Sequence, residues 1–152
     1  MTVDRTDGPM SRLTFLLAWH GGITDAWMRR TLSATGLSPR HAMTLMYLGS
    51  GPVSQQALID KLEVDPSVLV AILNDLESED LVRRRRDPAD RRRHIVEMTP
   101  DGTTTLGRLE IALTEVENEL FADLSEQERT VLRDLLNRIK TSPDGYTCAE
   151  GP

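Results

Sequence analysis

Seven arginines fall within eleven residues of this chain, and a turn signal interrupts them. The segment is Arg83-Arg84-Arg85-Arg86-Asp87-Pro88-Ala89-Asp90-Arg91-Arg92-Arg93. Aspartate favours the start of a turn and proline presets φ for the next position, so residues 87–90 are predicted to reverse the chain. Because the apolar alternation Ile95, Val96, Met98 follows, we expect a β-hairpin with arginines on both arms and at its tip. A solvated charge run or a disordered basic tail is the alternative.

The charge of this segment contrasts with that of the rest of the chain. Seven arginines less two aspartates give the segment a formal charge of +5, so a total of −6 leaves −11 for all other residues. A molecule with this asymmetry offers one place to a polyanion and repels it elsewhere.

Size and composition indicate one globular domain. The chain has 152 residues, of which 39% are hydrophobic and 28% charged. It lacks the roughly 18 consecutive apolar residues that a membrane span needs, and residues 1–5 lack the apolar core of a signal peptide. The one cysteine, Cys148, cannot form an internal disulfide, so a cytoplasmic location is expected. Redox sensing is the alternative to an incidental thiol.

Helical periodicity and cap residues divide the remainder of the chain. A flexible leader is expected at residues 1–10, a disordered tail at 141–152, and a first helix within 11–32. Gly36 ends that first helix, and a short one follows it as far as Leu48. The later start signals combine an N-cap residue with a first-turn proline or a capping box: Ser38-Pro39, Ser54, Asp65-Pro66, Thr99-Pro100 and Ser125-Glu128.

Two helices carry apolar residues spaced alternately three and four apart, as in a coiled-coil seam. The seams are Leu13, Leu16, His20, Ile23, Trp27 and Leu106, Leu109, Leu113, Val116, Leu120. They are broader than one small domain needs to cover itself, which predicts a homodimer formed through residues 11–32 and 100–140. An intramolecular core is the alternative.

The helix that begins after Asp65-Pro66 has two unlike faces. Its apolar residues Leu69, Ile72, Leu73 and Leu76 form one stripe for burial. The opposite face carries Ser67, Ala71, Asn74 and Ser78, with Val70 at its side, and is small and nearly uncharged until Glu77, Glu79 and Asp80 at its far end. Such a face can enter a DNA major groove, where Asn pairs with adenine, Ser with several partners, and Val or Ala with a thymine methyl. Packing against another helix is the alternative.

Two adjacent capped helices followed by a basic hairpin predict a winged helix-turn-helix. The chain resembles the MarR family of bacterial transcriptional regulators over residues 11–140. The resemblance is strongest in the segment Asp87-Pro88-Ala89-Asp90-Arg91-Arg92-Arg93-His94-Ile95-Val96-Glu97-Met98-Thr99-Pro100-Asp101-Gly102. The family's pattern for this segment is D-x-R-D-x-R-x-x-x-V-x-L-T-x-x-G. The expected fold is mainly α with a small β-wing: a helix-turn-helix at 54–80, a wing at 82–98, and N- and C-terminal helices forming a dimerisation region.

The resemblance also implies DNA contacts. Residues 66–79 would be the recognition helix, Arg92 would enter a minor groove, where negative potential is concentrated, and Asp90 would hold the arginines in place. The expected DNA-binding residues are Ser67, Val70, Ala71, Asn74, Arg84, Arg86, Asp90, Arg91, Arg92 and Arg93. Of these, Arg84, Arg86, Arg91 and Arg93 would meet phosphates. Three departures from the family pattern are Ala89 in place of arginine, Met98 in place of leucine, and the apolar segment 68–71, which puts in doubt the bases that are read.

Many members of the family bind a small aromatic or phenolic molecule between the dimer helices and the winged domain. The side chains expected near that crevice are Trp19, His20, Trp27, His41, Met43, Met46 and Tyr47. Trp19 and Trp27 could instead be core residues. No metal is expected, because neither His20 nor His41 has a partner at ligand spacing, and no cofactor is expected.

The function predicted is that of a ligand-responsive repressor, a homodimer that binds double-stranded DNA at a pseudo-palindromic operator. Three scattered histidines, no nucleophile motif and no glycine-rich phosphate loop argue against an enzyme. The alternative is a protein-interaction module that uses the basic hairpin on an acidic partner.

Overall fold

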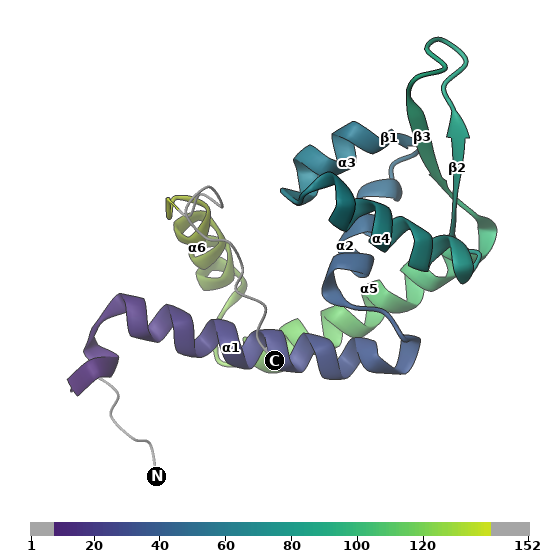
Figure 1. Ribbon diagram of the computed structural model, residues 1–152. Coiled ribbons are helices and arrows are strands. Elements are labelled where there is room, and N and C mark those ends of the chain that lie inside the picture. Colours follow the sequence, from purple (N-terminus) through teal and green to yellow (C-terminus); the bar gives the residue numbers. More distant parts are fainter. Residues whose placement is uncertain (1–7, 141–152) are drawn as a thin grey trace.

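The computed structural model describes residues 8–140, and Figure 1 shows a helical body from which a β-hairpin projects. The predicted tail with Cys148, and most of the predicted leader, lie outside this range, while Gly8–Ser11 form a 3-10 helix (η1). The other elements are α1 Leu13–Leu32, the 3-10 helix η2 Ser33–Thr35, α2 Pro39–Leu48, β1 Val53–Ser54, α3 Gln55–Leu62, α4 Pro66–Ser78, β2 Val82–Arg86, β3 His94–Met98, α5 Pro100–Leu120 and α6 Glu126–Asn137. The mainly helical class with a small wing is therefore confirmed.

The predicted start signals begin the observed helices. Ser54 Oγ accepts a hydrogen bond from the Ala57 N–H at 3.1 Å, and Thr99 Oγ1 accepts one from the Gly102 N–H at 3.0 Å. The Ser125–Glu128 capping box is present in both directions. Asp65 stands at the N-cap of α4 without a side-chain cap bond, so Pro66 alone supplies that signal. Helix α1 itself ends at Leu32, and Gly36, expected to end it, instead ends the 3-10 helix η2 that follows, in the left-handed conformation with a φ of 71°.

The sheet has three antiparallel strands in the order β1-β3-β2. Val82 pairs with Met98 and Arg86 with His94, which sets the register of the hairpin. The loop between them spans residues 87–93, so Arg91, Arg92 and Arg93 all lie in the loop. The expectation of arginines on both arms is therefore wrong for the second arm, which begins at His94. The two-residue strand β1, paired through Val53 and Val96, was not predicted.

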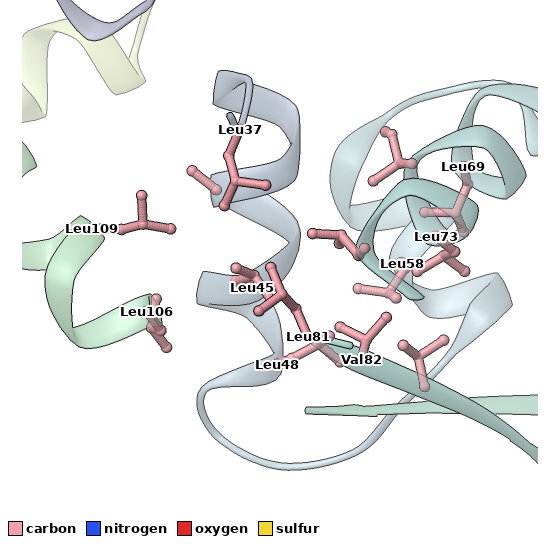
Figure 2. Close-up of a cluster of buried hydrophobic side chains, with 14 of the residues drawn as sticks. Leu37, Leu45, Leu48, Leu58, Leu69, Leu73, Leu81, Val82, Leu106 and Leu109 are labelled. Carbon is pink, nitrogen blue, oxygen red and sulfur yellow. The ribbon is translucent and has the colours of Figure 1, made fainter. Parts of the chain in front are cut away.

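Helix α2 is the centre of the hydrophobic core (Figure 2). Leu106 and Leu109 of α5 lie on one side of it, and Leu58, Leu69 and Leu73 from α3 and α4 lie on the other. Leu45, at the middle of α2, is fully buried. All four residues of the predicted α4 stripe are buried, which confirms that stripe and leaves the opposite side of the helix facing solvent.

Helix α5 crosses α1 and contacts it (Figure 1). The seam on α5 is partly used within the subunit, because Leu106, Leu109 and Val116 are buried. The seam on α1 is covered less, since Leu13 is 82% exposed and only Leu16 and Ile23 of its five residues are half-buried. No helix within residues 8–140 is both long and apolar enough to cross a membrane.

The first turn of α5 is packed tightly against the base of the hairpin. The Thr99 N–H donates to the Leu81 carbonyl oxygen at 3.0 Å, and Thr99 Oγ1 donates to the Asp80 carbonyl oxygen at 2.6 Å. A Cβ atom on Gly102 would overlap the Leu81 carbonyl oxygen and would lie 2.6 Å from Met98 Cγ. This close approach of backbone to backbone explains the glycine at the end of the motif.

We therefore predict that Gly102→Ala lowers the free energy of unfolding by about 1–3 kcal/mol or more, because the Leu81 backbone must move to admit a methyl group. Gly107→Ala, in the same helix with open space around it, should instead gain about 0.5–1 kcal/mol from helix propensity. Urea denaturation of the two variants and the parent protein measures both effects. Equal stability of the two variants would contradict the packing argument.

Candidate nucleic-acid interface

The outer face of α4, defined here as Ser67, Val70, Ala71 and Asn74, lies open to solvent. Val70 is 37% exposed, although its neighbour Leu69 is fully buried. The alternative that this face packs against another helix of the same subunit is therefore wrong. A smooth surface of small side chains with one amide is left available to a partner.

Two aspartates shape the wing, defined here as β2, β3 and the loop between them. Asp87 Oδ1 accepts from the Ala89 N–H at 2.9 Å, and Asp90 Oδ1 accepts from the Arg92 N–H at 3.0 Å. The Asp87 N–H donates to the Arg93 carbonyl oxygen at 2.9 Å and closes the loop. Aspartate forms such turns by accepting a hydrogen bond from the backbone N–H two residues on. The loop therefore has a defined conformation.

Four of the arginines have partners on the strands or helices around them. Arg83 and Arg85 both lie near Glu97 of β3, at 3.8 and 3.3 Å. Arg86 Nη1 donates to the Arg91 carbonyl oxygen at 2.9 Å and braces the loop. Arg84 points to the other side of the strand and pairs with Glu77 of α4. These guanidinium groups hold the wing together as well as carrying its charge.

At the tip, by contrast, the cations are exposed. Arg93 lies 3.7 Å from Asp90, a loose ion pair with a 70% exposed arginine side chain. Within residues 8–140, the side chains of Arg91 and Arg92 have neither a hydrogen bond nor an ion pair. Their charges are therefore available to an anion outside the chain.

The contact between Arg84 and Glu77 joins the wing to α4. Arg84 Nε and Nη2 donate to the two Glu77 carboxylate oxygens at 2.8 and 2.6 Å, and the Arg84 backbone N–H adds a bond of 3.1 Å. The hydrogen bond from Arg84 lowers the pKa of Glu77 below its usual value, and the same bond raises the pKa of Arg84. Both groups are therefore charged at neutral pH. The contact between Arg84 and a DNA phosphate stays a prediction, because the Arg84 guanidinium is already bound to Glu77.

A groove of about 550 Å³ runs between the wing tip and the start of α3. Arg92, Arg93 and His94 line one side of it, and Gln55, Gln56 and the carboxylate-bearing Asp60 are among the residues that line the other. The free N–H groups and partial positive charge of a helix N-terminus favour an anion there. The three residues His94, Gln55 and Gln56 were missed from the sequence. Only the cap at Ser54, which marks the start of α3, pointed toward them.

The seven side chains expected around an effector crevice do not come together in one cavity. His41 Nε2 lies 3.0 Å from Asp75 Oδ2 while its Nδ1 accepts from the Ser38 N–H, and the Tyr47 hydroxyl donates to the Lys61 carbonyl oxygen at 3.2 Å. The others are exposed: Trp19, His20, Trp27, Met43 and Met46. None of the seven lines the groove beside the wing. Within residues 8–140, no cluster of His, Cys, Asp or Glu could hold a metal ion.

Known proteins resemble this chain both in sequence and in structure. A family profile described as MarR family matches residues 35–93. A protein described as a transcriptional regulator for the hcr operon of Thauera aromatica is 38% identical over 112 residues, which cover 72% of this chain and 68% of that one.

Among solved structures, a mutant form of Escherichia coli MarR in complex with operator DNA superposes with a TM-score of 0.76 at 22% identity, covering 85% of this chain and 94% of that one. Bordetella bronchiseptica BpsR, whose DNA binding is regulated by 6-hydroxynicotinic acid, superposes with a TM-score of 0.78 at 21% identity, covering 90% and 98%. At this identity the two structures establish the winged-helix fold.

Proposed function

Because the chain belongs to the MarR family of DNA-binding transcriptional regulators, we propose that it is a homodimeric repressor released from its operator by a small aromatic ligand. Members of this family regulate transcription and are not enzymes. The observation that carries the proposal is that the outer face of α4 and the tip residues Arg91 and Arg92 are exposed, while Arg84 of the wing contacts Asn74 of that face. The alternative of a protein-interaction module gains nothing from these comparisons.

The proposed contacts divide between two grooves. The outer face of α4 would enter a major groove, while Arg92 would reach into the neighbouring minor groove with Asp90 holding its backbone. Arg91 and Arg93 would meet phosphates, and Arg86 would brace the loop. The groove between α3 and the wing tip would lie over the sugar-phosphate backbone of the DNA, because its cations and the helix N-terminus can bind a phosphate.

We predict that Arg92→Ala weakens binding to an operator, chosen by selection from random duplex DNA, by roughly 1–3 kcal/mol. Arg83→Ala removes the same charge from the strand side that faces Glu97, so it should weaken binding less. Fluorescence anisotropy at one fixed salt concentration compares the two, because DNA affinity depends steeply on salt. Equal losses would mean that net charge alone counts, and an unchanged Arg92→Ala affinity would reject the role of the tip.

Exposed apolar residues on the terminal helices support the proposed homodimer. Leu13 and Trp19 on α1 are 82% and 50% exposed, and Leu135 on α6 is 51% exposed. On α6 the apolar residues gather on one side: Val131, Leu132, Leu135 and Leu136. Large apolar faces on separate helices that the subunit leaves uncovered indicate an interface. A twofold partner would place two copies of the α4 and wing surface on one DNA face.

We predict that Leu135→Asp separates the dimer, since a carboxylate would replace a leucine in the interface. Thr130→Asp adds the same charge on the opposite side of α6 and should leave the dimer intact. Sedimentation velocity distinguishes a particle of 17.0 kDa from one of twice that mass, and circular dichroism checks that both variants stay helical. A parent protein that sediments as a monomer at micromolar concentration would refute the homodimer.

The effector is proposed to be a hydroxylated aromatic acid, the class to which the 6-hydroxynicotinic acid of BpsR belongs. Trp27, Met43 and Met46 are large side chains with exposed surface on α1 and α2, and an aromatic or thioether lining suits such a ring. In a dimer, the partner would close the crevice that the single subunit leaves open.

Trp19→Phe leaves Trp27 as the only tryptophan, so its fluorescence reports this crevice alone. We expect hydroxybenzoates or 6-hydroxynicotinate to quench it at the concentrations that release DNA in anisotropy measurements. Trp27→Phe, which retains Trp19, should show little quenching. Release of DNA without any change in Trp27 fluorescence would place the effector elsewhere.

A further inference from the structure

The amide of Asn74 is oriented by a cation from the wing. Asn74 Oδ1 accepts a hydrogen bond from Arg84 Nη2 at 2.7 Å. A guanidinium group has donors and no acceptor, so the oxygen and not the nitrogen of the amide must face it. The amino group therefore points away from Arg84, and it has no hydrogen-bond partner among residues 8–140.

Arg84 is itself held in place. Its Nε and Nη2 both bond to Glu77, one turn further along α4, and its side chain is 23% exposed. Because Nε and Nη2, which form one edge of the guanidinium, both bind the Glu77 carboxylate, Arg84 cannot swing away without breaking a bidentate ion pair. The chain Glu77–Arg84–Asn74 therefore fixes one amide on the outer face of α4.

We propose that Asn74 reads DNA as a hydrogen-bond donor and selects a keto base, guanine or thymine, at the position it contacts. This inference rests on the proposed function, in which α4 enters the major groove. A free asparagine pairs best with adenine, donating to N7 and accepting from the N6 amino group. Here Oδ1 already accepts from the Arg84 cation, so an adenine or cytosine amino group would have to use the second lone pair, with its positive hydrogen next to that cation, and the bond would be weaker.

The remaining chemistry favours acceptors on the base. Guanine offers O6 and N7 and thymine offers O4, whereas cytosine offers its N4 amino group at the major-groove edge. Adenine keeps only N7 as an acceptor for Asn74. The discrimination is that of one neutral hydrogen bond, roughly three- to tenfold in affinity. Arg84 is thus a positioning residue that acts on the base through Asn74.

The experiment uses the full-length protein and sequences selected from random duplex DNA. Asn74→Ala identifies the base pair that Asn74 contacts, because the preference should vanish at that position alone. There the parent protein should prefer guanine or thymine over adenine and cytosine by roughly three- to tenfold. A preference for adenine or cytosine, or no position affected by Asn74→Ala, would overturn the proposal.

Arg84→Lys tests the positioning role. Lysine can still pair with Glu77 as a point charge but lacks the fork that reaches two acceptors, so the freed amide should shift the preference toward adenine. Arg85→Lys, the same change on the strand side that faces Glu97, should not. A merely structural role for Arg84 would lower affinity for all four bases alike, and an unchanged preference in Arg84→Lys would overturn the mechanism.

Asn74→Asp provides a second variant that keeps the size of the side chain and the bond to Arg84. It has no donor, so the keto preference should disappear in favour of cytosine or adenine. A retained keto preference would count against the proposal. Failure of the proposed function has a different signature: the parent protein would show no salt-sensitive binding to any duplex, and no base preference could be measured.

Discussion

Burial of the leucine stripe on α4 determines which side of that helix meets the outside. Leu69, Leu73 and Leu76 pack into the core around α2, and a fully buried leucine contributes about 1.5–3 kcal/mol relative to an exposed one. Rotating α4 to hide its outer face would place these leucines in water. The surface of Ser67, Ala71 and Asn74 is therefore presented to a partner as a consequence of packing on the other side.

The positive charge is concentrated on the wing, beside the packed helices, rather than spread along a tail. A chain with a formal charge of −6 places seven arginines on one hairpin. Among the residues that the structure describes, nearby carboxylates pair with some of these arginines and leave others free. Glu97 holds Arg83 and Arg85, Glu77 holds Arg84, and the tip is left with Arg91 and Arg92 unpaired within the described residues. Arg83 and Arg85 are 64% and 42% exposed, so their pairs with Glu97 add little stability, whereas the Arg84 side chain paired with Glu77 is only 23% exposed. The effect of these pairs is to settle where each cation stands.

The fold could be predicted from the sequence where the signals are local. The caps at Ser54, Thr99 and Ser125 and the stripe on α4 depend on residues a few positions apart, and all are observed. The outward direction of Asn74 followed from the same periodicity. Contacts between distant elements could not be predicted in this way: Arg84 to Asn74, His41 to Asp75, and the short strand β1 beside β3. Helical periodicity says which way a side chain points and not which partner it finds.

The joint at Thr99 and Gly102 gives the molecule a mechanical property. Thr99 and Gly102 seat the first turn of α5 on the Leu81 carbonyl, and Arg84 ties β2 to α4, so no pivot separates the long helix from the hairpin. A helix of 21 residues is about 30 Å long at 1.5 Å per residue. In the proposed dimer, a tilt of α5 by a few degrees would move the attached wing as a lever does and change the distance between the wing tips of the two subunits. The joint at the base of α5 is rigid because Gly102, which has no Cβ atom, lets the first turn of α5 pack directly on the Leu81 backbone.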